Sequence, residues 1–155
     1  MKGMRKDGGN ALVEFAMTLP VLAMLLVGIL YGGITFYDYV TLANAVSIGA
    51  RTLAVSRSAG TGGASGQNAC VLAQAAVESA ATNLKASFLS IPTPTFAGAS
   101  TCSALASGDS GTVAASYPCQ FTVPFANVSL CPGQGAAQCG AASPCIRAAT
   151  TVRIE

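Results

Sequence analysis

The side chain whose position most strongly suggests chemistry is Glu14. It follows the glycine pair Gly8 and Gly9 and stands directly before residues 15–37, a run of 23 residues with no charged side chain. A carboxylate inside or beside so long an apolar segment is costly, about 2.5–3.5 kcal/mol at the middle of a membrane and less near its surface. We therefore expect Glu14 to gain a positively charged partner, and a new amino terminus released by cleavage nearby would supply one.

Catalytic chemistry has little support in the sequence. The chain lacks histidine, and its acidic residues beyond the apolar run are scattered singly. It therefore shows no carboxylate pair, no Ser-His-Asp set, no phosphate-binding loop and no metal cluster. The serines in its loops have no base beside them, and such serines are normally solvated rather than nucleophilic. We expect a protein that binds or assembles, without enzymatic activity, cofactor or metal.

The other chemically informative group is a set of six cysteines, all of which follow the apolar run: Cys70, Cys102, Cys119, Cys131, Cys139 and Cys145. An even number of cysteines in a small extracytoplasmic domain predicts a disulfide framework. Zinc binding is the competing interpretation, and it is weaker because the chain has neither histidine nor a Cys-x-x-Cys spacing. Six cysteines allow 15 pairings, and the sequence does not choose among them.

These groups must be positioned by a membrane helix and one small domain. As a helix, residues 15–37 would extend about 34 Å at 1.5 Å per residue, enough to cross a hydrocarbon core of about 30 Å. Lys2, Arg5 and Lys6 precede the run, so the positive-inside rule places residues 1–9 in the cytoplasm and the chain after about Asp38 outside. Residues 10–155 hold five positive and five negative side chains and form no basic patch, which argues against nucleic-acid binding.

Apolar spacing extends the helix beyond this run. The stripe recurs at helical intervals, at Leu42, Val46, Gly49 or Ala50, and Leu53. We predict one helix over about residues 11–55, with a kink or local loosening at Pro20. Gly28 and Gly32 form a small-xxx-small pattern suited to close helix packing. The tyrosines that could mark the outer membrane interface are Tyr31, Tyr37 and Tyr39.

The rest of the chain is expected to complete an α+β fold. A second helix is predicted from about residue 68 to 88, with an apolar face of Cys70, Val77, Ala81, Leu84 and Phe88. Beyond the proline-containing segment 91–94 we predict a small antiparallel sheet with disulfides. Its strands are expected at 111–116, 120–125 and 148–154, with a turn at 117–119. The expected organisation is a leader at 1–9, a long helix at 10–57, a Gly/Ser-rich linker at 58–67 and an extracytoplasmic domain at 68–155.

The region around Glu14 resembles the processing site of type IV pilins and pseudopilins. In those proteins a prepilin peptidase cuts after a glycine, and a glutamate is the fifth mature residue. Here the cut would follow Gly9, Asn10 would be the first mature residue and Glu14 the fifth, with Phe15 directly after it. Together with residues 18–22, 34–37 and 49–51, the segment 8–57 is most similar to the TadE-like family, the minor pseudopilins of tight-adherence (Tad) pilus systems. The resemblance implies a pilin-like fold, cleavage between Gly9 and Asn10, and a role in pilus assembly or initiation and in surface adherence.

The same resemblance implies partners and a location. The partners would be the prepilin peptidase, the major pilin, a sibling pseudopilin and the inner-membrane assembly platform, with the lipid bilayer around the helix. The chain would be a single-pass protein of the bacterial inner membrane, with a cytoplasmic N-terminus and a periplasmic or extracellular C-terminal domain. It would either be incorporated in the pilus or only prime its assembly.

Two other interpretations stay open. The chain could be an unprocessed, membrane-anchored extracytoplasmic binding protein in which Glu14 only snorkels to the cytoplasmic interface. It could instead be a secreted disulfide-rich protein whose signal peptide is cut after Ala45, since residues 43–45 have the small-x-small pattern of such sites.

Overall fold

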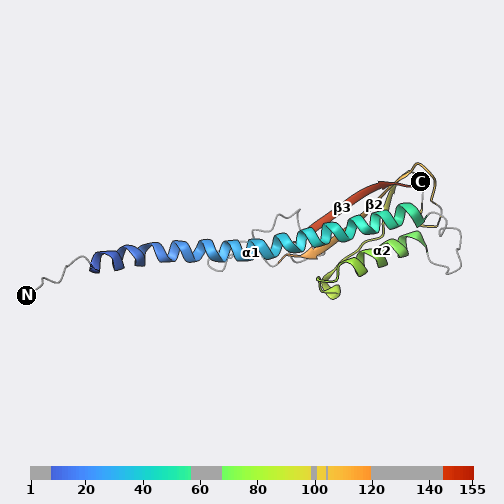
Figure 1. Cartoon of the computed structure of the whole chain (residues 1–155). Helices are drawn as coiled ribbons and strands as arrows, with labels where there is room; N and C mark the ends of the chain where they lie inside the picture. The colour runs from blue at the N-terminus through green and yellow to red at the C-terminus, as the bar shows by residue number, and fades with distance from the viewer. Residues whose placement is uncertain (1–7, 57–67, 99–100, 104, 120–144) are drawn as a thin grey trace, which may run out of the picture. The chain divides into compact units, whose positions relative to one another are not determined.

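The computed structural model describes residues 8–56, 68–98, 101–103, 105–119 and 145–155. The chain divides into two compact units, Met1–Ile34 and Thr35–Glu155. The described elements are a long helix, a second helix, a short 3-10 helix and three strands, which confirms the predicted α+β class (Figure 1). The predicted linker at 58–67 lies outside the described residues.

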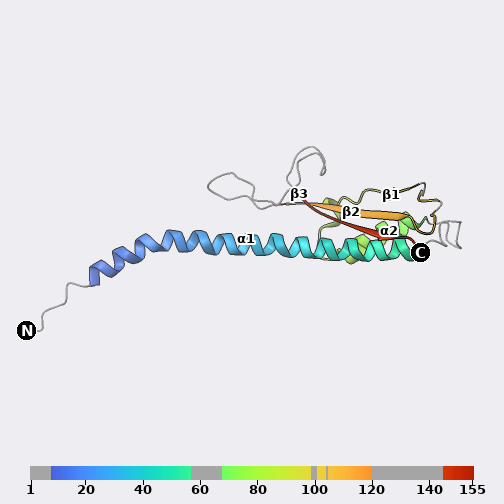
Figure 2. The same ribbon diagram turned by 90° about the horizontal axis from the view of Figure 1, so that it is seen from above.

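Helix α1 is continuous over Gly8–Val55, a length of 48 residues. This confirms the single helix predicted for residues 11–55. The helix passes through Pro20 without ending, although proline removes one backbone hydrogen bond and favours a bend. Figure 2 shows the blue, N-terminal part of α1 bent rather than straight.

Helix α2 covers Ala69–Ala80 and ends well before Phe88, so the predicted C-terminal end was wrong. The Ala81 N–H still donates to the Val77 carbonyl at 3.0 Å, but the chain then turns. Thr82 and Asn83 follow directly, and such side chains compete with helical hydrogen bonds and favour turns. The helix therefore stops at the first residues that stabilise an alternative backbone path.

After this turn comes η2, a single 3-10 turn over Ala86–Phe88. Most of the predicted apolar face of the second helix is buried: Cys70, Val77, Ala81 and Leu84. Phe88 is the exception, with half of its side chain exposed. The change of helix type explains this, because Phe88 no longer follows the α-helical period that would place it on the buried face.

The sheet has three antiparallel strands in the order β1-β2-β3. They are β1 (Thr95–Ala97), β2 (Ser110–Pro118) and β3 (Cys145–Arg153). The last strand was predicted at residues 148–154 and is confirmed with an earlier start. The register pairs Ala115 with Ala148, and a separate bridge pairs Ser90 with Ser116 beside β1.

Two details of the predicted sheet need correction. The turn predicted at 117–119 is wrong, because β2 continues through Tyr117 and Pro118, which pair with the start of β3. Pro118 is the last residue of β2, a position where the missing N–H does not interrupt the ladder. Strand β1 was not predicted, and the strand predicted at 120–125 lies outside the described residues.

The core of the Thr35–Glu155 unit lies between the helices and one face of the sheet. Its largest fully buried side chains come from α1, α2, β2 and β3, with Ile154 just after the last strand: Leu42, Val46, Leu53, Cys70, Val77, Val113, Ile146 and Ile154. In Figures 1 and 2, α2 runs alongside the later part of α1 next to the sheet. The C-terminal part of α1 is therefore a core helix of the small domain.

Candidate membrane anchor and processing site

The first part of α1 carries large apolar side chains on all sides, and they are exposed among the described residues. Every large hydrophobic side chain between Leu12 and Val40 is exposed. Soluble proteins rarely expose contiguous apolar surface of more than a few hundred Å², and a helix that is apolar all round is normally buried or lies in a membrane. Among the described residues, α1 is the one helix long and apolar enough to cross a membrane. We therefore identify the uncharged run of this part, residues 15–37, as a candidate membrane anchor.

The character of α1 changes at Leu42. From there to the end of the helix, the predicted stripe of Leu42, Val46, Ala50 and Leu53 is almost completely buried. These side chains meet α2 and the sheet in one hydrophobic cluster. One continuous helix thus has a bare part (residues 12–40), suited to lipid or to other helices, and a packed part that belongs to the Thr35–Glu155 unit. We call this unit the outer domain because the sequence predicts that it lies outside the membrane.

Gly49 lies at the closest approach between α1 and α2. A Cβ atom built on Gly49 would overlap Val77 Cγ2, would lie 3.0 Å from the Ala73 carbonyl oxygen, and would lie 3.6 Å from Val113 Cγ1. Any side chain here would push against the backbone of α2 as well as against its side chains. The glycine is therefore required by packing and not by backbone conformation, since the residue is helical.

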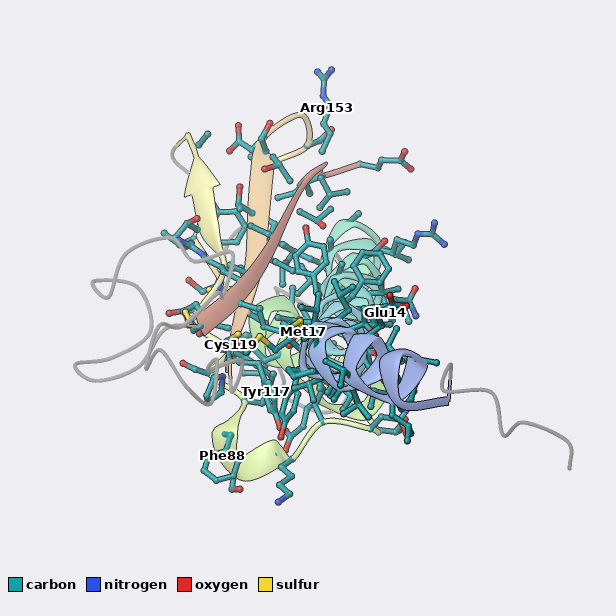
Figure 3. The ribbon with its side chains drawn as sticks, turned by 90° about the vertical axis from the view of Figure 1, so that its left-hand side faces the viewer. Glu14, Met17, Phe88, Tyr117, Cys119 and Arg153 are labelled. Atoms are coloured by element: carbon teal, nitrogen blue, oxygen red, sulfur yellow. A yellow bond between two sulfur atoms is a disulfide. The ribbon has the colours of Figure 1, made fainter. Side chains whose placement is uncertain are left out.

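Glu14 lies on the exposed surface of α1, near its N-terminal end (Figure 3). Among the described residues it has no hydrogen-bond or ion-pair partner. Phe15 beside it is 59% exposed. Gly9 and Asn10 are within the first turn of α1, so the nitrogen of Asn10 is about 6 Å from Glu14 along the helix axis. The carboxylate is thus open to a partner that the described residues do not supply.

Gly28 and Gly32 lie in the bare part of α1. In the described structure no atom is within 4 Å of the position that a Cβ would take at either residue. The predicted role of this pair in helix packing therefore concerns neighbouring molecules, and it stays a prediction.

At the end of the uncharged run, the structure shows a contact that the sequence did not predict. Asn83 Nδ2 donates a hydrogen bond of 2.8 Å to the Tyr37 hydroxyl, and Thr41 Oγ1 donates to the Tyr37 carbonyl at 2.9 Å. The next residue, Asp38, is half-buried, and burial raises the pKa of its carboxyl above the ordinary value. No periodicity could reveal the Tyr37–Asn83 contact, because its partners are 46 residues apart.

The disulfide framework is present in the outer domain. Cys70 of α2 is bonded to Cys102, which closes a long loop through η2 and β1. Cys119 and Cys145 are also disulfide-bonded, and Figure 3 shows Cys119 beside Tyr117. The candidates Cys131 and Cys139 lie outside the described residues. Within the described ranges, no group of three or more His, Cys, Asp or Glu could hold a metal ion.

Comparison with known proteins concerns the same part of the chain as these features. No curated protein and no solved structure gave a match. Residues 9–51 match the family model described as TadE-like protein. The matched segment begins at Gly9, contains Glu14 and the whole bare part of α1, and ends just beyond Gly49. This match confirms the resemblance predicted from the sequence: the N-terminal helix, over residues 9–51, is similar to that of TadE-like proteins.

Proposed function

We propose that this protein is a minor pseudopilin of a Tad-type pilus. It is inserted in the inner membrane by α1, cut between Gly9 and Asn10 by a prepilin peptidase, and needed for pilus assembly or initiation and for surface adherence. The observation that carries the proposal is the coincidence of two features in one segment. The TadE-like match covers residues 9–51, and every large hydrophobic side chain of the same helix from Leu12 to Val40 is exposed.

Cleavage would supply the partner that Glu14 lacks among the described residues. Hydrolysis after Gly9 leaves an α-ammonium group on Asn10, one helical turn before the Glu14 carboxylate. The carboxylate can neutralise this amine in its own chain or in a neighbouring subunit that is staggered along the fibre. Its position near the helix N-terminus also suits the helix dipole. In a packed bundle the pair would be desolvated, so the loss of one partner would leave an uncompensated charge.

The exposed part of α1 then has two successive environments. Before assembly it lies in the bilayer, with residues 1–9 cytoplasmic and the Thr35–Glu155 unit outside. During assembly it packs against α1 helices of the major pilin and of a sibling pseudopilin, and Gly28 and Gly32 allow close approach of the helix axes. The inner-membrane assembly platform would act on the chain at this step. This role needs neither a catalytic site nor a cofactor in the chain itself.

The burial of the packed part of α1 disfavours secretion after cleavage at Ala45. Leu42 and Ala45 are fully buried in the core of the outer domain. A cut after Ala45 would remove both side chains, and the loss of one buried leucine alone typically costs about 2–5 kcal/mol. The unprocessed anchored protein is the alternative that the burial does not address.

The test of this role is Glu14→Ala, in cells that carry the complete pilus system, with Glu78→Ala as the matched control. Glu78 is an exposed acid of α2, remote in sequence from the processing site. We expect Glu14→Ala to be processed to the same mature length as the wild type but to leave few or no pili, while Glu78→Ala supports normal pili. Normal piliation with Glu14→Ala would contradict the proposed neutralising role.

A further inference from the structure

The turn between α2 and β1 lies at the place where α1 emerges from its uncharged run. Asn83 of this turn donates a hydrogen bond of 2.8 Å to the hydroxyl of Tyr37. Tyr37 is the last residue of the run, and its own side chain is more than half exposed. The turn is therefore held at the level of the outer membrane interface whenever the run occupies a bilayer.

The exposed side chains of this turn are of the kinds that interfaces favour. Phe88 is 50% exposed and projects outward from the η2 ribbon in Figure 3. Lys85, three residues earlier, is also exposed. Outside α1, the described residues include two large exposed hydrophobic side chains, Phe88 and Val71. Phe88 is thus the large exposed apolar side chain of the segment that follows Asn83, whereas Val71 is near the opposite end of α2.

We propose that the segment Lys85–Phe88, here called the interfacial turn, rests on the outer leaflet of the bilayer, with the Phe88 ring among the headgroups and upper acyl chains. Aromatic side chains are favoured at this depth, and the long Lys85 stem allows its ammonium group to reach lipid phosphate. The interfacial turn is linked to the membrane-spanning run, because Asn83, two residues before the turn, donates a hydrogen bond to Tyr37 of that run. The inference rests on the membrane anchoring proposed above.

The charges around the turn determine which lipids it should select. Lys85 is the one charged residue between Glu78 and Asp109 in the sequence, and Asp38 follows Tyr37 on α1. A single lysine attracts anionic lipid only weakly compared with a cluster of basic residues. We expect the contact to depend on insertion of Phe88 and to form on zwitterionic phosphatidylcholine as well as on anionic bilayers.

The absence of tryptophan from the chain permits a direct test with the full-length protein in phosphatidylcholine nanodiscs. Phe88→Trp introduces a single fluorophore in the interfacial turn, and Ser87→Trp places one beside it in case the first variant folds poorly. Val71→Trp is the matched control, since Val71 is similarly exposed at 45%. Met24→Trp, in the bare part of α1, reports whether the helix is in the bilayer. Discs with lipids brominated just below the headgroups are compared with unbrominated discs.

We expect Phe88→Trp to lose emission in the brominated discs and to emit at shorter wavelength than Val71→Trp, which should not be quenched. Quenching of Met24→Trp without quenching of Phe88→Trp and Ser87→Trp would overturn the inference and leave the anchor intact. A Met24→Trp variant that is not quenched would refute the anchor and the inference together. Equal quenching of Phe88→Trp and Val71→Trp would also overturn the inference. So would a blue shift of Phe88→Trp emission that depends on protein concentration and not on lipid, because this would indicate a second copy of the chain on the turn.

Discussion

Gly49→Ala tests whether the packed part of α1 approaches α2 as closely as the structure shows. In a helix this substitution normally stabilises, because alanine is favoured over glycine by about 1 kcal/mol. Here the new Cβ would overlap Val77 Cγ2 and would lie 3.0 Å from the Ala73 carbonyl oxygen. Overpacking of a filled core typically costs about 1–3 kcal/mol, and a contact with backbone favours the upper part of that range. We expect a net loss of about 1–2 kcal/mol in the free energy of unfolding of the outer domain.

The measurement is thermal unfolding of the oxidised, full-length protein in nanodiscs, followed by circular dichroism. For a small domain, 1 kcal/mol corresponds to roughly 4–8 °C in Tm, so the expected decrease is readily resolved. Gly33→Ala is the control, because it is in the same helix but has no atom within 4 Å of its Cβ position. We expect it to leave the unfolding of the outer domain unchanged.

A second substitution locates the clash. Val77→Ala removes two buried methyl groups and should itself destabilise by at least about 1.5 kcal/mol. In the double variant the new Cβ of residue 49 fills the space that Val77 leaves. The stability loss of the double variant should therefore be smaller than the sum of the two single losses, by a coupling energy of about 0.5–3 kcal/mol. A Gly49→Ala variant as stable as the wild type, or strictly additive losses in the double variant, would refute the close approach of α1 and α2.

Three further predictions concern the disulfide, the membrane exit and the sheet. Replacing Cys70 and Cys102 together by alanine opens a loop with a sequence separation of 32; this should lower the free energy of unfolding by about 3–4 kcal/mol, and a denaturation midpoint equal to the wild type would contradict it. Burial raises the pKa of Asp38, so the folded state favours the protonated carboxyl more than the unfolded state does. The contribution of Asp38 to stability is therefore present at low pH and declines as pH rises from about 4 through the raised pKa. The stability of Asp38→Asn relative to wild type should increase over that interval, and a constant difference would refute burial as the cause. Gly111→Ala should destabilise, since its Cβ would lie 2.9 Å from Leu53 Cδ2, and unchanged thermal unfolding would count against the contact of β2 with α1.

The sequence contains enough information to predict α1 because one physical signal dominates it. Its apolar run exceeds the length of a membrane span, and the stripe from Leu42 to Leu53 has a strict helical period, so length and period agree. Gly49 could be predicted to lie on this stripe but not to touch Val77. That contact depends on the path of α2, which no local pattern specifies.

The end of α2 and the short strand β1 were beyond prediction for a related reason. Apolar spacing continues from Ala81 through Leu84 to Phe88, but the turn at Thr82 and Asn83 brings the chain back to pair Ser90 with Ser116. Long-range pairing therefore overrides a local helical pattern. Strand β1 has only three residues, too few for alternation to be recognised.

The disulfide and the Tyr37–Asn83 contact show a second limit. Six cysteines predict a framework but not its pairing, because pairing depends on which residues the fold brings together. The side chains of Tyr37 and Asn83 are likewise ordinary surface types, and only the folded domain brings them within hydrogen-bond distance. At the proposed processing site the sequence motif is more informative than the geometry, since Glu14 has no partner in the described part of the chain.

The central claim, cleavage between Gly9 and Asn10, is tested most directly by the mass of the mature N-terminal peptide of the protein isolated from cells that contain a prepilin peptidase. We predict that the peptide begins at Asn10, with Glu14 as its fifth residue. A peptide that begins at Met1 would show an unprocessed membrane-anchored protein, and one that begins at Val46 would show a secreted protein. Either result would contradict the account.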